Sequence, residues 1–215
     1  MKNSACALKI TAGGLEKGEK WLFRDLNLEI PKGHFLGIRG PSGAGKTSLL
    51  EVMAQTSILT EGSFQRPRSS LAWIDQHCSL TPSLSAGENI LLGCLHRRSW
   101  LQTLFGLSSL NGSEVPGILE QLDFQVPLSI RVGLLSGGER QRISIARALY
   151  QNADLLLADE PVSMLPEVLQ VRALDLLKNQ TSKGSSVVCV LHNEKLLKDY
   201  ADQILILDQS TWRFI

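Results

Sequence analysis

A glycine-rich loop in the first quarter of the chain constrains the fold more than any other feature. Residues 40–47, GPSGAGKT, fit the pattern G-x-x-x-x-G-K-[ST] without a mismatch, between a predicted strand at 35–39 and a predicted helix at 47–54. Glycines let successive backbone N–H groups converge on phosphate oxygens, and the helix N-terminus adds a partial positive charge. The loop therefore predicts a nucleotide-phosphate site in which Lys46 reaches the β- and γ-phosphates and the Thr47 hydroxyl ligates Mg²⁺. The candidate nucleotide contacts are Gly40, Pro41, Ser42, Gly43, Ala44, Gly45, Lys46, Thr47 and Ser48.

The rest of the chain predicts an α/β fold with a P-loop NTPase core and a mostly parallel sheet. Near-continuous apolar runs at residues 71–74, 154–158, 186–191 and 203–207 are typical of strands buried on both faces. Alternating segments around residues 8–10 and 26–30 predict an N-terminal antiparallel β subdomain that ends at the turn 31–33. Residues 77–135 are rich in Leu, Ser and Gly and contain three prolines, which we interpret as a mostly helical subdomain inserted in the core. Residues 1–215 are thus predicted to form one domain.

Composition excludes several classes of function. The chain is 43% hydrophobic and 20% charged with a net charge of +1, which gives no reason to expect nucleic acid as a partner. Its apolar runs are too short to span a bilayer and residues 1–10 lack a signal-peptide core, so we expect a cytoplasmic protein. The cysteines Cys6, Cys78, Cys94 and Cys189 lack metal-ligand spacing and are expected to be reduced thiols in or near the core.

Two consecutive carboxylates follow the predicted strand at 154–158. Successive residues of a strand point in opposite directions, so Asp159 and Glu160 can take different tasks. We expect Asp159 to hold the Mg²⁺ shell and Glu160 to polarise the attacking water, a contribution of about 10²–10⁴ in rate. The alternative is a polar strand end before a turn at Pro161. Beside an intact phosphate loop, the catalytic interpretation is favoured.

A second candidate anion site is the segment 135–141, LSGGERQ. Ser136 supplies a hydroxyl, Gly137 and Gly138 permit close backbone approach, and a helix is predicted from about Glu139. Taken alone, the segment fits a well-capped helix without a ligand. Its position, about ninety residues after the phosphate loop and about twenty before Asp159, resembles the LSGGQ signature of the ABC family. The inner face of the helix is predicted to contain Ile143, Ala146 and Leu149.

The resemblance to ATP-binding subunits of ABC transporters covers essentially the whole chain and implies further roles. Gln76 matches the Q-loop glutamine, which senses Mg²⁺ and the membrane partner, and His192 matches the switch histidine, which contacts the γ-phosphate. With the phosphate loop and Asp159–Glu160, both follow predicted parallel strands, whose carboxyl ends bind ligands in open α/β sheets.

The resemblance also implies partners and a location. Two ATPase subunits, as a homodimer, would pack head to tail so that Ser136 and Gly138 of one clasp ATP held by the other. Hydrolysis would drive solute transport through membrane permease subunits, with a solute-binding protein involved indirectly. The chain would lie on the inner face of the cell membrane.

Within the family, the chain is most similar to the ATPase subunits of phosphonate-type importers. The matching segments are 88–93, 100–107, 157–162, 191–192 and 200–202. Segment 100–107 also fits a generic amphipathic helix. The resemblance implies import of phosphonate or a related anion.

Four departures from the family pattern stand out. Pro166 replaces the aspartate of Ser-x-Leu-Asp, which puts communication between the two sites in question, and Asn193 replaces the usual aspartate after His192. No adenine-stacking aromatic lies near residues 15–17, and Trp21, the nearest candidate, is predicted to be a core strand residue. Lys46 and Gln76 are only 30 positions apart, which is more similar to some metal-ion importers.

Three alternative functions remain open at this point. A catalytically impaired or regulatory ABC subunit fits Pro166 and the missing aromatic, but Lys46, Asp159, Glu160 and His192 are intact. A soluble ABC protein of DNA repair or translation would ordinarily carry a long coiled coil or a second nucleotide domain. A P-loop kinase would leave the segment 135–141 unexplained.

Overall fold

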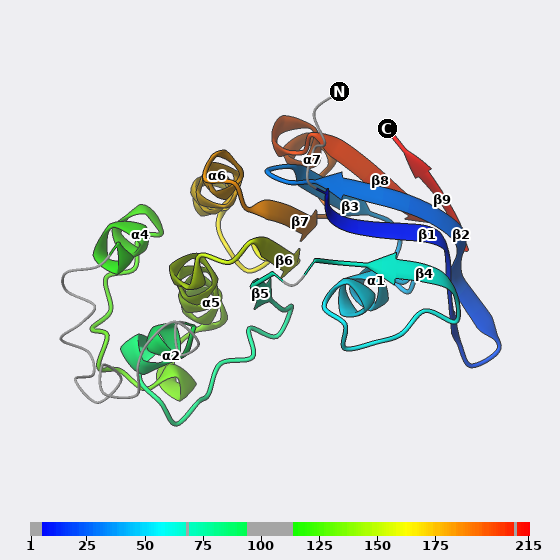
Figure 1. Cartoon of the computed structure of the whole chain (residues 1–215). Coiled ribbons are helices and arrows are strands. Elements are labelled where there is room, and N and C mark those ends of the chain that lie inside the picture. Colours follow the sequence, from blue (N-terminus) through cyan, green and yellow to red (C-terminus); the bar gives the residue numbers. More distant parts are fainter. Residues whose placement is uncertain (1–5, 68, 94–113, 209) are drawn as a thin grey trace.

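The fold is built on a six-stranded sheet in the order β5-β6-β7-β3-β8-β9 (Figure 1). The computed structural model describes residues 6–67, 69–93, 114–208 and 210–215. The first five strands of the sheet are parallel, and β9 adds an antiparallel edge, which confirms the predicted mostly parallel sheet. In that order the strands are Leu71–Ile74, Leu155–Asp159, Ser186–Val190, Phe35–Arg39, Gln203–Asp208 and Thr211–Phe214.

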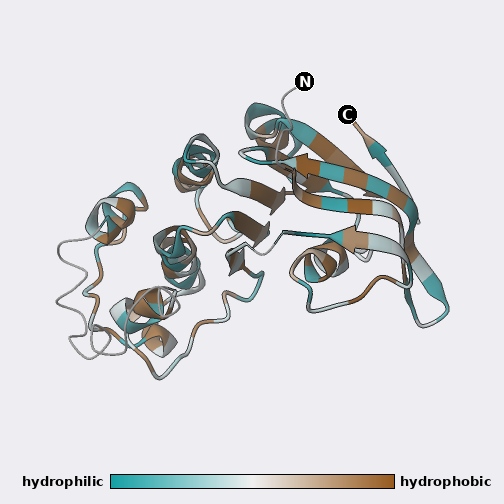
Figure 2. Ribbon diagram, in the orientation of Figure 1, coloured by the Kyte–Doolittle hydropathy of each residue, from teal (hydrophilic) through white to brown (hydrophobic). Residues whose placement is uncertain are grey.

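Apolar residues of the sheet alternate between two cores because a strand sends successive side chains to opposite faces. Leu155 and Leu157 pack with α1 (Lys46–Met53) and the N-terminal strands, whereas Leu156 and Ala158 pack with the helices of the other face. Those helices are α5 (Gly137–Gln151), α6 (Glu167–Ser182) and α7 (Glu194–Tyr200). Figure 2 shows the apolar central strands enclosed between these layers. The near-continuous apolar runs in the sequence follow from this double burial.

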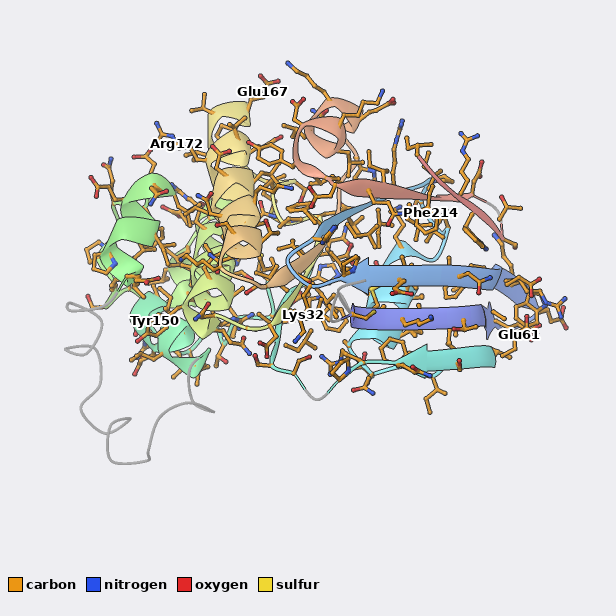
Figure 3. The ribbon with its side chains drawn as sticks, turned by 45° about the horizontal axis from the view of Figure 1, so that its top comes forward. Lys32, Glu61, Tyr150, Glu167, Arg172 and Phe214 are labelled. Carbon is orange, nitrogen blue, oxygen red and sulfur yellow. The ribbon has the colours of Figure 1, made fainter. Side chains whose placement is uncertain are left out.

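An antiparallel sheet of three strands forms the N-terminal subdomain, in the order β2-β1-β4. Strands β1 (Cys6–Lys17) and β2 (Lys20–Pro31) contain the two predicted segments and are longer than the predicted ones. Strand β4 (Glu61–Gln65) was not predicted, because it is short, polar and largely exposed. Glu61, labelled in Figure 3, starts this strand and pairs with Arg24 of β2 at 2.8 Å. β4 thus attaches the chain that leaves α1 to the rest of the subdomain.

The segment 77–135 contains short helices where it is described. They are α2 (Ala86–Leu92), α4 (Val115–Gln121) and the 3₁₀ helix η3 (Val132–Leu134), and α2 and α4 pack against α5. The residues 94–113, which include Cys94 and the segment 100–107, lie outside the described residues. The subdomain boundary at 77–135 therefore stays a prediction.

Of the remaining features, Cys78 and Cys189 are buried free thiols and Cys6 is half-buried. In the described parts of the chain, no helix is both long enough and apolar enough to cross a membrane.

We predict that Gly62→Ala lowers the free energy of unfolding more than Gly184→Ala does. Both glycines have left-handed backbones, with φ of 85° and 96°, so each substitution costs about 1–2 kcal/mol for conformation alone. A Cβ at residue 62 would also lie 2.2 Å from the carbonyl oxygen of Ala12, whereas Gly184 has open space around it. This clash raises the expected total for Gly62→Ala to roughly 2–5 kcal/mol. Urea denaturation of both variants measures the difference, and equal losses would contradict the close approach of β4 to β1.

Candidate nucleotide-binding site

The loop after β3 has the geometry of a phosphate cradle. Gly45 precedes α1 in a left-handed conformation, with φ of 91°, which an L side chain rarely adopts. The first N–H groups of α1 have no partner within the helix and point out of its N-terminus. The sequence therefore places unpaired donors and a partial positive charge where the motif predicted them.

Lys46 is buried at the start of α1, and its ammonium group bonds to the loop itself. The Nζ atom donates to the carbonyl oxygens of Gly40 at 2.8 Å and Pro41 at 2.9 Å. An ammonium group has three donors, so these two bonds leave one for a ligand oxygen. The charge is thus fixed at the rim of the loop before any nucleotide arrives.

Asp159 lies at the end of β6, buried beneath the start of α1. The Thr47 hydroxyl donates to Asp159 Oδ2 at 2.6 Å, so two of the three residues predicted to hold Mg²⁺, Thr47 and Asp159 but not Gln76, are in contact. Burial raises the pKa of the Asp159 carboxyl and the Glu160 carboxylate adds to this rise, although the bond from Thr47 opposes it. A cation bound beside this oxygen would relieve the cost of keeping the carboxylate charged there.

Glu160 directly follows β6 and has contacts different from those of Asp159. Its Oε1 lies 2.6 Å from His192 Nε2, and its Oε2 lies 3.5 Å from Gln76 Nε2. Three residues from the ends of β5, β6 and β7 therefore meet at one point. The group contains a carboxylate that can accept a proton, an imidazole and an amide.

A cavity of about 470 Å³ lies over the loop and brings most of the predicted residues together. Lys17 and Leu22, from the β1–β2 hairpin, also line it and were not predicted. The predicted residues that line it are Ser42, Gly43, Gly45, Lys46, Thr47, Ser48, Gln76, Glu160 and His192. Three predicted contacts of the phosphate loop fall outside this lining: Gly40 and Pro41 line a neighbouring cavity together with His192, and Ala44 is buried in the core. Asp159, predicted for the Mg²⁺ shell, does not line the cavity either.

The turn 136–138 starts α5 and does not line this cavity. The helix begins at Gly137 rather than near Glu139, because Ser136 and Glu139 form a capping box: the Ser136 hydroxyl accepts from Glu139 N at 3.3 Å and donates to Glu139 Oε2 at 2.7 Å. These bonds lower the pKa of the Glu139 carboxyl. A Cβ on Gly137 would lie 2.9 Å from Met164 Sδ, so the turn packs closely against the chain that follows Glu160. The predicted inner face of α5 is confirmed, since Ile143, Ala146 and Leu149 are buried.

The structure shows where the residues connected with three of the departures from the family pattern lie. Asn193 caps α7, with its Oδ1 accepting from the backbone N–H groups of Lys195 and Leu196. Pro166 is the N-cap of α6 and makes no side-chain cap bond. Trp21 is on a strand as predicted, but it is half-buried rather than in the core, and the Arg24 guanidinium lies 4.5 Å from its ring centre. None of these side chains lines the cavity over the loop.

The fold and the site together define a P-loop nucleotide-binding protein. It has a second, separate glycine turn at residues 136–138, hereafter the signature turn. The sequence profile of the ABC transporter family matches residues 23–163, about two thirds of the chain. The chain therefore belongs to the ABC transporter family. It is an ATP-binding, ATP-hydrolysing subunit of that family.

Individual relatives and solved structures agree with this assignment. The phosphonates import ATP-binding protein PhnC of Pseudomonas entomophila is 34% identical over 218 residues, covering 93% of this chain and 82% of that protein. The PhnC of Thiobacillus denitrificans is 35% identical over 199 residues, covering 85% and 76%. The dimeric structure of a bacterial ABC transporter cassette matches with a TM-score of 0.84 and 25% identity, covering 97% of both chains.

Proposed function

We propose that this chain is the motor subunit of an ABC importer in which two copies enclose ATP at composite sites. The observation that carries the proposal is the meeting of Lys46, Gln76, Glu160 and His192 around one cavity, with the signature turn outside it. A second copy packed head to tail would bring its own Ser136, Gly137 and Gly138 over that cavity. In such a dimer the signature turn of each copy would contact the ATP bound by the other copy.

Each residue at the cavity has a task in this proposal. The N–H groups of the loop and the Lys46 ammonium hold the β- and γ-phosphates. Glu160 takes a proton from the attacking water, and His192, 2.6 Å from it, orients the carboxylate and contacts the γ-phosphate. The Gln76 amide lies 3.5 Å from the other carboxylate oxygen of Glu160. From there Gln76 can respond both to the γ-phosphate of ATP and to the membrane partner.

The residues present fit a magnesium ion bound jointly with the nucleotide. Thr47 Oγ1 and Asp159 Oδ2 adjoin each other, and Gln76 lies at the same end of the sheet. Among the residues that the structure describes, no three His, Cys, Asp or Glu side chains cluster to hold a metal by themselves. Mg²⁺ commonly uses one or two carboxylates plus substrate phosphates and waters. Bound in this way, the ion would supply charge neutralisation between the phosphates.

The partners follow from the family. We infer a homodimer of this chain on the cytoplasmic face of the cell membrane, where the Gln76 loop touches permease subunits and a solute-binding protein delivers the solute. The phosphonate importers among its relatives favour a phosphonate or a related anion as that solute. The short sequence separation between Lys46 and Gln76, which is more similar to that of some metal-ion importers, favours a metal ion as the solute instead. Transport assays with the permease that assembles with this chain would decide between them.

Two structural expectations belong to this proposal. Residues 1–215 act as a single ATPase domain, and the segment 77–135 is a helical subdomain inserted in its core. A catalytically impaired subunit is the second candidate, since Pro166 removes a carboxylate from the chain that packs on the signature turn. The contacts of Lys46, Thr47, Glu160 and His192 favour an active subunit.

We predict that Glu160→Gln traps an ATP-bound dimer. The amide keeps the shape of the side chain but cannot accept the proton of the water, so hydrolysis falls to a slow residual rate and the dimer stays closed. Light scattering in saturating Mg-ATP measures the mass, with Lys46→Met as a control that should stay monomeric for lack of phosphate binding. A Glu160→Gln protein that binds ATP and yet remains monomeric would contradict the composite site.

Two capping boxes in the chain allow a matched test of the signature serine. Ser85 and Ser136 cap α2 and α5 with the same set of bonds, so Ser85→Ala and Ser136→Ala should each cost about 1 kcal/mol of stability. We predict that only Ser136→Ala also lowers ATP hydrolysis, by about tenfold, the cost of one hydrogen bond to a charged group. Steady-state ATPase rates and thermal melts separate the two effects. Equal rates for both variants would show that Ser136 acts as a cap alone.

The walls of the cavity predict weak discrimination between ATP and GTP. Beyond the phosphate loop the β1–β2 hairpin contributes Lys17 and Leu22, neither of which is aromatic. An aliphatic contact with the base does not distinguish the exocyclic groups of adenine and guanine. We therefore expect the affinities for ATP and GTP to agree within about tenfold. Competition binding measures the ratio. Lys17→Tyr adds a stacking surface and should tighten both nucleotides; a strong preference of the unmodified chain for ATP would contradict the interpretation.

A further inference from the structure

A buried glutamine of α5, Gln141, contacts the backbone beside Glu160. Its side chain is only 1% exposed, although glutamine is mostly a surface residue in folded proteins. It does not line the nucleotide cavity. A buried amide is costly unless its polar atoms are paired, so the pairing of this side chain indicates what it does.

The Gln141 amide is fully engaged with the turn that follows β6. Its Nε2 donates to the Glu160 carbonyl oxygen at 3.1 Å and lies 3.4 Å from Ser163 Oγ. Its Oε1 accepts from the backbone N–H of Met164 at 2.9 Å. The side chain therefore spans the turn from its first residue to its fifth.

Glu160 needs such support because its backbone is strained. Its φ is 51°, in the left-handed region that residues other than glycine rarely adopt. Conformations of this kind persist where the surrounding structure holds them in place. The Glu160 carbonyl receives three donors, from Gln141 Nε2, from Ser163 Oγ at 3.1 Å and from Ser163 N at 3.3 Å, while its own N–H donates to Val190.

We propose that Gln141 is a positioning residue for hydrolysis, which sets the direction of the Glu160 carboxylate by holding the Glu160 carbonyl. The inference rests on the proposed role of Glu160 as the group that activates water. Fixing the carbonyl in the left-handed conformation directs the side chain toward His192 and the cavity. Gln141 touches neither the cavity nor the nucleotide loop, so it acts on the rate of the chemical step and not on ATP binding.

The position of Gln141 on α5 connects this support to the signature turn. Gly138 and Gln141 are on the same helix, and a Cβ on Gly138 would lie 3.1 Å from the Met164 carbonyl oxygen. The turn 160–164 is thus held by the start of α5 through its backbone and through the Gln141 side chain. When a second copy's nucleotide engages the signature turn, the Glu160 carboxylate is held by the same helix.

The first test is Gln141→Met, which keeps the length of the side chain and removes its three hydrogen bonds. We expect kcat for ATP hydrolysis to fall by about 10- to 100-fold, because small misplacements of a reacting group cost this much. The KM and the Kd for ATP should stay within about twofold, since no ground-state contact is lost. Gln180→Met is the matched control: Gln180 is also buried, but among the described residues its amide donates to the Leu176 carbonyl of its own helix and to no part of the turn.

The control separates positioning from packing. Suppose that Gln180→Met lowers the melting temperature as much as Gln141→Met does but keeps its kcat. The lower kcat of Gln141→Met then results from the lost contacts to the turn 160–164. A Gln141→Met protein whose kcat equals that of Gln180→Met would overturn the inference. If Gln141→Met does not fold, Ser163→Ala is the second variant, because it removes an exposed donor to the Glu160 carbonyl. Ser163→Ala should lower kcat without changing KM. An unchanged kcat would also overturn the inference.

A double-mutant cycle distinguishes this inference from the proposed function. In single-turnover assays, Gln141→Met should cost less than about twofold in a Glu160→Gln background, because residues that act through one another are not additive. Independent, multiplicative losses would overturn the inference. If Glu160→Gln itself hydrolyses ATP at the unmodified rate, the proposed role of Glu160 fails first. If Glu160→Gln is inactive and Gln141→Met is not impaired, only the inference about Gln141 fails.

Discussion

The parallel register of four neighbouring strands fixes the geometry on which the site depends. Ile38 of β3 pairs with Val190 of β7, and Val190 pairs in turn with Asp159 of β6. On the other side, Ala158 of β6 pairs with Ile74 of β5. The strands therefore end at one level, and the residues that follow them meet around one cavity. A slip of one residue in any pair would turn the apolar side chains to the wrong face and move one functional group out of reach.

This register is stable because both faces of the sheet are covered, and the same burial shapes the chemistry. Asp159 ends a strand whose residues are all buried, so its carboxylate lies at the edge of an apolar interior. The raised pKa of this group follows from that position, and Thr47 is its one neutral donor among the described residues. A site that holds a carboxylate in this way favours a cation beside it. Glu160, one residue later, lines the cavity over the phosphate loop.

Much of this could be predicted from the sequence, because the phosphate loop and the buried strands are encoded locally. The strand β4 could not, since it is polar and its pairing with β1 depends on tertiary structure. Lys17 and Leu22 reach the cavity only because the β1–β2 hairpin packs over Gly45, where a Cβ would lie 2.9 Å from Leu22 Cβ. The sequence analysis assigned no role to the Gln141 side chain, and nothing in the local pattern signals its burial, since glutamine is mostly a surface residue. The true beginning of α5 at Gly137 could have been predicted, since Ser136 and Glu139 have the spacing of a capping box.

The two loops that carry Gln76 and Glu160 are both attached to α5, although they leave different strands. Arg147 of this helix donates to the carbonyl oxygens of Ser79 at 2.9 Å and Cys78 at 3.4 Å, just after Gln76. Burial lowers the pKa of the Arg147 guanidinium, so these carbonyls are bonded by a cation partly withdrawn from water. The phosphate loop, in contrast, is supported by β3 and α1. A movement of α5 relative to the sheet would therefore displace Glu160 and Gln76 together while leaving the phosphate loop in place. Such an arrangement allows hydrolysis to depend on the position of the signature turn without loss of the nucleotide.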